Sequence, residues 1–349
     1  MFARVATLAA ATLVVASTLG SWSYPAAASV HVQPEVNFAL PSTAAGCGGA
    51  TTLAGGATRI PITVSTVAGQ VAELVNVCIE GSGPFPFIID SGAGESIIDA
   101  HLAQRLRLAH RGAASQFAGV GCTGSSQAVA VTSWSAAGAP LAAQNLTAAT
   151  LPDFGTKGQP VGLLGSDVLS RFGSIRLDFT AQTLTFGQPQ GPSITSPSEV
   201  KGPVGSAPST VLTQGEHGTS VPLTVKEAPG NTSLNVQLRL NRGKPYNFVV
   251  DTGSSQSVVS SDVAKAKHLT HTDMAQRQTT VCSTITVPLV HSGPWSVPGV
   301  SLHPQLLGTT SFGPISAGGT AGLLGSDQLI RFGWVILDYK GGRMVLGRG

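Results

Sequence analysis

Residues 87–92 read FIIDSG, and residues 248–253 read FVVDTG. Each stretch is a run of strand-forming apolar residues that ends in an aspartate, a hydroxyl residue and a glycine. A second pair lies downstream, where residues 162–173 read GLLGSDVLSRFG and residues 322–333 read GLLGSDQLIRFG. The first pair recurs after 161 residues and the second after 160. This nearly constant spacing predicts a duplicated unit and therefore a protein of two lobes.

The composition favours β-structure. Of 349 residues, 11% are charged and 42% are hydrophobic, with 43 Gly and 22 Pro. So little charge disfavours a helical bundle or a coiled coil, whereas Val, Ile and Thr among Gly and Pro favour short strands joined by turns. We predict an all-β fold whose two lobes are related by a pseudo-twofold axis, with short helices. The net charge of +3 includes no basic run, so we expect no binding to nucleic acid.

The segments outside the repeats predict export. One basic residue, Arg4, precedes an apolar stretch that ends in Ala26-Ala27-Ala28, a pattern typical of a cleavable signal peptide. An uncleaved membrane anchor is the alternative. The predicted order is a signal peptide at 1–28, an extended leader at 29–58, a first lobe at 59–187, a linker at 188–218 and a second lobe at 219–349. We therefore expect a secreted or cell-envelope monomer without stable membrane insertion after cleavage, and leave open whether the leader is an activation segment.

Four cysteines follow the predicted cleavage site: Cys47, Cys78, Cys122 and Cys282. An even number in an exported chain predicts two disulfides, for which three pairings are possible. Cys122 and Cys282 share the repeat spacing of 160 residues. Because the cysteines lack the close pairs typical of a zinc site, we expect no metal.

The chemistry is predicted to lie at the two repeated aspartates, Asp90 and Asp251. An apolar strand places each carboxyl at a poorly solvated strand end, and a pseudo-twofold axis would bring the two together. Two carboxyls in contact share one proton, so one serves as general base for water and the other as general acid. This chemistry needs neither a cofactor nor a metal. The residues expected to support the dyad are Ser91, Gly92, Thr252 and Gly253.

The paired motifs resemble those of aspartic proteases, and each unit is similar to the retropepsin type. In that family an Asp-[Ser/Thr]-Gly loop is followed by two apolar residues and a glycine, as in residues 163–165 and 323–325 here. The resemblance implies that Asp90 and Asp251 form the catalytic dyad. It also implies hairpin flaps, near 117–131 and 278–290, that close over an extended peptide. Neither candidate flap contains the tyrosine of pepsin-like enzymes.

Three further motifs have simpler interpretations. Ser254 follows the second motif and is expected to hydrogen-bond near Asp251, which would make Asp251 the ionised base. Residues 119–124 fit G-x-G-x-x-G, but a strand-like segment follows, so we expect a flap tip and not a nucleotide loop. Asp167 and Asp327 are expected to cap short helices.

The sequence thus predicts an exported aspartic endopeptidase that cleaves unfolded or extended polypeptides at acidic pH. The first alternative is a catalytically idle binding protein of the cell envelope that keeps the same fold. A glycosidase also uses two carboxylates, but that chemistry does not require Asp-[Ser/Thr]-Gly loops at a pseudo-twofold axis.

Overall fold

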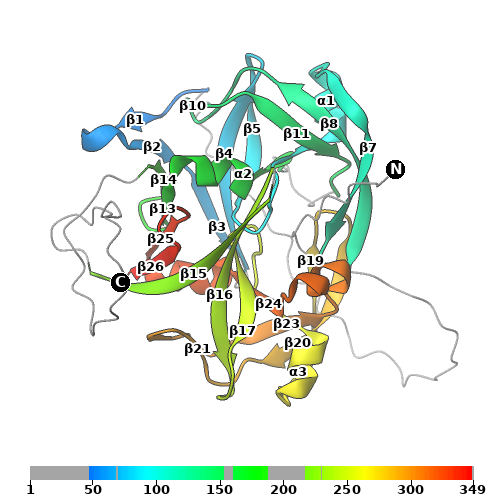
Figure 1. Ribbon diagram of the computed structural model, residues 1–349, viewed down its shortest axis with the longest axis vertical. Coiled ribbons are helices and arrows are strands. Elements are labelled where there is room, and N and C mark those ends of the chain that lie inside the picture. Colours follow the sequence, from blue (N-terminus) through cyan, green and yellow to red (C-terminus); the bar gives the residue numbers. More distant parts are fainter. Residues whose placement is uncertain (1–46, 68–69, 153–159, 188–216, 229, 348–349) are drawn as a thin grey trace, which may run out of the picture.

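The computed structural model describes residues 47–67, 70–152, 160–187, 217–228 and 230–347. The predicted signal peptide, most of the leader and nearly all of the linker lie outside these residues. The two repeats form two lobes, one in the upper and one in the lower half of Figure 1, and both consist mainly of strands. The predicted all-β fold with short helices is confirmed. No helix in the described part of the chain is both long and apolar enough to cross a membrane.

The first lobe contains fourteen described strands. These are β1 (Thr51–Thr52), β2 (Thr58–Pro61), β3 (Thr63–Val67), β4 (Gln70–Ile79), β5 (Ser82–Asp90), β6 (Ile97–Asp99), β7 (His110–Gly119), β8 (Cys122–Val131), β9 (Trp134–Ala136), β10 (Ala139–Leu141), β11 (Gln144–Ala149), β12 (Gly162–Gly165), β13 (Ser174–Asp178) and β14 (Thr183–Phe186). Its helices are α1 (Ala100–Arg105) and α2 (Ser166–Leu169), with 3-10 turns η1 (Ala54–Gly56) and η2 (Ser170–Phe172).

The second lobe repeats much of this order. Its strands are β15 (Gly218–Ala228), β16 (Asn231–Leu240), β17 (Tyr246–Asp251), β18 (Val258–Ser260), β19 (His271–Thr279), β20 (Thr284–His291), β21 (Trp295–Val297), β22 (Val300–Ser301), β23 (Leu306–Thr310), β24 (Gly322–Gly325), β25 (Trp334–Asp338) and β26 (Arg343–Gly347). Its helices are α3 (Ser261–Ala266) and α4 (Ser326–Leu329), with 3-10 turns η3 (Gly313–Gly318) and η4 (Ile330–Phe332).

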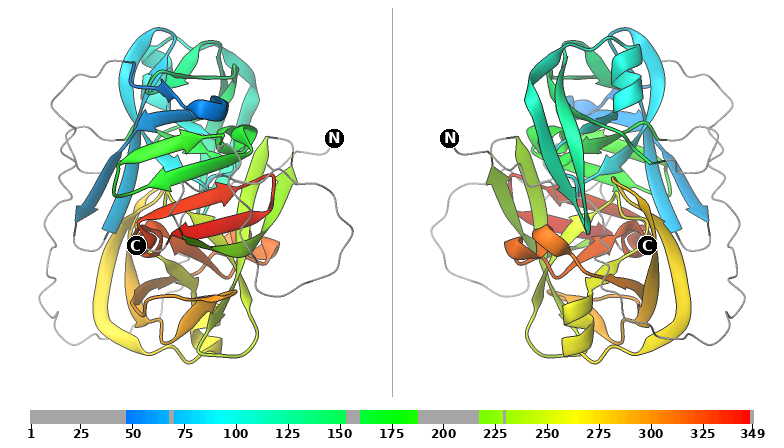
Figure 2. Two further views of the ribbon diagram at one scale, coloured as in Figure 1. Left: turned by 90° about the vertical axis from the view of Figure 1, so that its left-hand side faces the viewer. Right: turned by 90° about the vertical axis from the view of Figure 1, so that its right-hand side faces the viewer.

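A shared antiparallel sheet joins the lobes. The last two strands of each repeat lie side by side in the order β14-β13-β25-β26, seen as green and red arrows in Figure 2. In the β13–β25 pair, Arg176 lies opposite Ile336, its own counterpart at the repeat spacing. An antiparallel contact between equivalent residues is the signature of a twofold relation. The pseudo-twofold axis therefore passes through this pair.

Apolar packing continues from one lobe to the other. The main core runs from Ile60 and Phe87 in the first lobe to Phe248 and Leu346 in the second. Phe87 and Phe248 are equivalent residues of β5 and β17, and both are completely buried. Because one core supports both lobes, the strands that carry the two motifs are held on a common base.

The start of the first lobe lies earlier than predicted. Cys47 forms a disulfide with Cys78 of β4, and β1 pairs with β2. Residues 47–57, which we assigned to the leader, are therefore attached to the first lobe through both a covalent bond and a strand pair.

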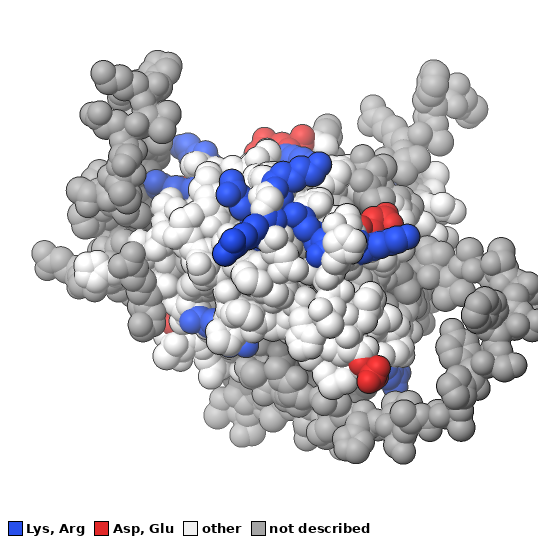
Figure 3. Space-filling view, turned by 90° about the horizontal axis from the view of Figure 1, so that it is seen from below, with Lys and Arg blue, Asp and Glu red and all other residues white. Residues whose placement is uncertain are grey.

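Folding gathers charge that is scattered in the sequence. Figure 3 shows Lys and Arg side chains together on the lower face of the molecule. Exposed basic residues there come from the end of β16 with the following turn and from α3, namely Arg239, Arg242, Lys244 and Lys265. The sequence has no basic run, so this face arises only because two distant segments meet.

Candidate active site

Each motif aspartate is the last residue of a central strand. Asp90 ends β5 and Asp251 ends β17. Strand β12 runs parallel to β5 with Gly165 opposite Asp90, and β24 runs parallel to β17 with Gly325 opposite Asp251. The two motifs of each repeat, more than 70 residues apart, are therefore neighbours in one sheet.

Hydrogen bonds lock the two aspartate loops together. The backbone N–H of Ser91 donates to Thr252 Oγ1 at 2.9 Å, and the N–H of Thr252 donates to Ser91 Oγ at 3.1 Å. The hydroxyls then donate onward, Ser91 Oγ to the Val250 carbonyl at 2.8 Å and Thr252 Oγ1 to the Ile89 carbonyl at 2.7 Å. All four bonds cross between the lobes, so the hydroxyls fix the loops relative to each other.

The glycines of the motifs leave room for the opposite carboxyl group. A Cβ atom on Gly92 would overlap the carboxyl of Asp251, and a Cβ on Gly253 would overlap that of Asp90. Any side chain at either position would therefore separate the two aspartates. The close approach of the carboxyls requires glycine in both motifs.

The two aspartates meet in a buried site. Asp90 is 5% exposed, Asp251 is 2% exposed, and their carboxyls hydrogen-bond to each other. Burial raises the pKa of Asp90, although the N–H groups of Ala93 at 2.8 Å and Gly92 at 3.0 Å favour its charged form. Burial raises the pKa of Asp251 well above its usual value, and the neighbouring charge of Asp90 raises it further. The pair therefore retains one proton, with Asp251 the more strongly protonated partner.

This order differs from the expectation based on Ser254. The Ser254 hydroxyl donates to the Gln256 carbonyl at 2.7 Å, and only its backbone N–H donates to Asp251, at 2.9 Å. The expected hydroxyl contact is thus replaced by a local turn. Without it, the charge of the neighbouring carboxylate determines which aspartate keeps the proton.

Comparison with known proteins assigns this arrangement to a family. Residues 75–168 and 236–327 each match the family model described as aspartyl protease, and together they make up more than half of the chain. The chain belongs to the aspartyl protease family. It is also similar to the crystal structure of an aspartic proteinase from Irpex lacteus, with a TM-score of 0.47 and 12% identity over 84% of this chain and 97% of that one. No curated protein matches the chain.

Beneath the dyad of this aspartyl protease, the two lobes differ. Ser166, which starts α2, donates to the Ser91 carbonyl and lies 2.9 Å from the Tyr339 hydroxyl. Its counterpart Ser326 donates to the Thr252 carbonyl at 3.1 Å and to Glu73 Oε2 at 3.0 Å. Each serine thus receives a partner from the opposite lobe, a phenol in one case and a carboxyl in the other.

Glu73 is the residue of this site that sequence reasoning missed. It lies on β4, is completely buried, and its Oε1 has no hydrogen-bond partner. Burial raises the pKa of Glu73 to about 8, against an ordinary value of 4.5. Its counterpart at the repeat spacing is Leu234, so no repeated motif pointed to it. The available signal was a single glutamate among the apolar residues of a predicted central strand.

The aspartates after the Leu-Leu-Gly motifs do not cap helices. The N-cap of α2 is Gly165, without a side-chain cap bond. Asp167 instead accepts hydrogen bonds from Ser96 Oγ at 2.6 Å and from Gln144 Nε2 at 2.8 Å. Asp327 likewise accepts from Ser257 and Gln305. The predicted caps are therefore wrong, and these carboxyls brace the loop behind each motif against a neighbouring strand.

Two long hairpins occupy the predicted flap positions. One is β7–β8, with G-x-G-x-x-G at its tip, and the other is β19–β20. Their tips are joined by the disulfide between Cys122 and Cys282. The described residues contain no group of three or more His, Cys, Asp or Glu arranged to hold a metal.

Proposed function

We propose that this protein is an exported aspartic endopeptidase that hydrolyses peptide bonds with a water activated between Asp90 and Asp251. One observation carries the proposal: two buried carboxyls, one from each repeat, contact each other where they cannot both ionise. Membership of the aspartyl protease family supports a peptide as substrate.

In the proposed reaction the two aspartates have opposite tasks. The Asp90 carboxylate takes a proton from water as the oxygen attacks the scissile carbonyl carbon, and Asp251 gives its proton to the carbonyl oxygen. A tetrahedral diol results. Asp90 then donates its proton to the amide nitrogen, the C–N bond breaks, and Asp251 regains a proton from one hydroxyl of the diol. Both carboxyls end in their starting states, and the water has been added across the peptide bond.

Export is part of the proposal. The pattern of residues 1–28 and the two disulfides support an extracytoplasmic location, because disulfides persist in oxidising compartments. We propose that 1–28 is removed on export and that 188–218 links the lobes. Since one chain supplies both aspartates, a monomer is sufficient for activity.

The test is cleavage of a denatured protein and a peptide library between about pH 3 and 7, with and without a statine-type inhibitor. Asp90→Asn and Asp251→Asn are each expected to lower the cleavage rate by about 10²- to 10⁴-fold, the usual contribution of a general acid or base. Asp262→Asn, which changes an exposed acid of α3, is the matched control and should leave cleavage unchanged. Cleavage that survives either dyad substitution would overturn the proposal.

The idle binding protein remains the second candidate, because both carboxyls are nearly inaccessible under the hairpins. The same variants separate the two functions. A binding protein keeps its affinity for a peptide after Asp90→Asn and never releases cleaved product, whereas an enzyme turns the peptide over and loses that turnover.

A further inference from the structure

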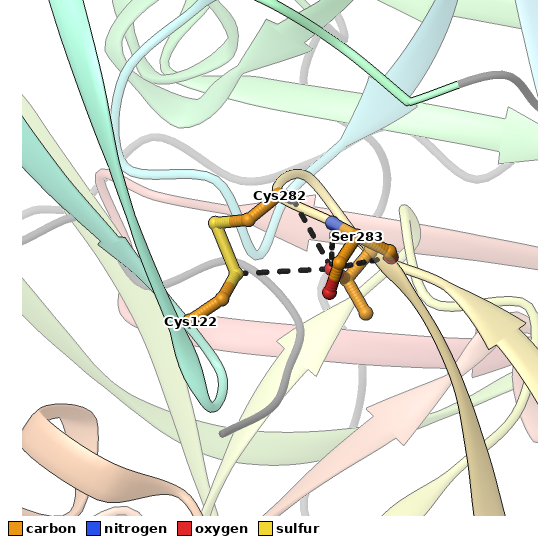
Figure 4. Close-up of a disulfide and its surroundings, with 4 residues drawn as sticks. Cys122, Cys282 and Ser283 are labelled. Atoms are coloured by element: carbon orange, nitrogen blue, oxygen red, sulfur yellow. Dashed lines mark hydrogen bonds between the residues drawn. A yellow bond between two sulfur atoms is a disulfide. The ribbon is translucent and has the colours of Figure 1, made fainter. Parts of the chain in front are cut away.

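The tips of the two flaps are covalently joined. Cys122 is the first residue of β8, directly after the turn of the first hairpin, and Cys282 lies in the turn between β19 and β20. Their Cα atoms are 6.0 Å apart. Figure 4 shows the bridge connecting the ends of the two hairpins. The flaps therefore form a continuous arch from one lobe to the other.

The bridge lies on the pseudo-twofold axis that also relates the dyad. Cys122 and Cys282 are equivalent residues at the repeat spacing, as are Arg176 and Ile336 in the shared sheet. Equivalent residues that contact each other must lie at the axis. Asp90 and Asp251 meet on this axis as well. The shared sheet, the dyad and the disulfide are thus three successive contacts along one line.

Each flap tip packs against the opposite lobe. Val120, at the tip of the first flap, is completely buried against second-lobe residues that include Val249 and Phe312. Val281, at the tip of the second flap, is buried with first-lobe residues that include Ala93, which directly follows the Asp90 motif. The arch therefore lies directly over the aspartate loops and contacts both lobes.

The second tip is itself a tight turn. The buried Thr280 hydroxyl accepts from the N–H of Cys282 at 3.2 Å and of Ser283 at 3.0 Å, and it donates to the Ser283 carbonyl at 2.8 Å. The same oxygen lies 3.7 Å from Cys122 Sγ. These contacts hold Cys282 in place against the first flap, so the bridge joins two ordered ends.

These contacts have a topological consequence. Separate flaps can part at their tips and admit a chain from the side. Bridged flaps can lift only together, and the space between arch and dyad remains enclosed by a closed ring however far the arch rises. A polypeptide can enter such a ring only end first.

We propose that the intact Cys122–Cys282 bridge restricts this protein to linear polypeptides with a free, unfolded end, which thread beneath the arch to reach the dyad. The inference rests on the proposed peptidase function and narrows its substrate class. Internal loops of folded proteins and cyclic peptides are excluded while the bridge is intact, whatever their sequence.

The experiment places one cleavable sequence in three contexts: a linear peptide, a head-to-tail cyclic peptide, and a linker between two stably folded domains. The protein with its bridge intact, verified by mass spectrometry of non-reduced digests, should cleave the linear peptide only. The double variant Cys122→Ser/Cys282→Ser should cleave all three. The variant Cys47→Ser/Cys78→Ser lacks the other disulfide, keeps the arch, and should behave like the unmodified protein.

Cleavage of the cyclic peptide or the flanked linker by the protein with its bridge intact would overturn the inference. A further comparison needs no variant: a linker with one folded end should be cleaved and a linker with two should not. Equal cleavage of both would again overturn it. Failure to cleave even the linear peptide would overturn the proposed function itself, so the two failures are distinguishable.

Discussion

Replacing Glu73 by glutamine is expected to remove a large part of the pH dependence of stability. Burial keeps Glu73 protonated up to a pKa of about 8 in the folded protein, whereas the unfolded chain ionises it near 4.5. Below pH 4.5 both states bind the proton, so Glu73 contributes no pH dependence. Between these values only the folded state binds it, so the free energy of unfolding falls as the pH rises. Over this interval, at about 1.4 kcal/mol per pH unit, the loss is about 5 kcal/mol.

The assay is urea unfolding followed by tryptophan fluorescence at pH 4.5 and pH 8, with the disulfides intact. Glu73→Gln should lose less stability than the unmodified protein between the two pH values, with a difference approaching the magnitude above. Glu227→Gln, on the exposed end of β15, is the matched control and should keep the original pH dependence. Identical pH dependence in Glu73→Gln and the unmodified protein would refute the reasoning, because Glu73 would then ionise freely in the folded state.

Three further outcomes are expected. Gly92→Ala should abolish cleavage, because its methyl group occupies the space of the Asp251 carboxyl, whereas Gly48→Ala, where the space is open, should not; equal activity in both would contradict the close approach. Tyr339→Phe should lower the free energy of unfolding by about 1 kcal/mol in urea titrations, since Ser166 loses a buried partner, and an unchanged midpoint would count against this contact. Peptidase activity should fall as the pH rises through the raised pKa values of the dyad, and a rate that instead increased towards alkaline pH would exclude a shared proton.

The repeat explains why the arrangement of the site could be predicted. Two equal motifs at one spacing require a pseudo-twofold relation, and that relation alone brings Asp90 to Asp251. The same argument applies to Cys122 and Cys282, which share the spacing and are joined in the structure. We left their pairing open among three possibilities, although equivalent residues at a twofold axis are natural partners.

What breaks the repeat could not be predicted. Glu73 occupies the position that Leu234 holds in the other lobe, and Tyr339 occupies the position of Phe179. Each departure is meaningful only through a contact with a serine of the opposite lobe, more than 170 residues away. Local sequence carries no signal for such a contact. The expected caps at Asp167 and Asp327 failed for a related reason, since their partners come from strands distant in sequence.

The buried acids relate the stability of the protein to its proposed chemistry. Burial raises the pKa values of Asp90, Asp251, Glu73 and Asp327, the last to about 6. Each of these groups is neutral at low cost in acid, and each makes the folded state less stable as the pH rises. Glu80 acts in the opposite direction, because hydrogen bonds from Thr132 and Ser133 lower its pKa, but it is largely exposed. A dyad that needs one retained proton therefore lies in a fold whose other buried carboxyls also favour acid, so that pH affects catalysis and stability in the same direction.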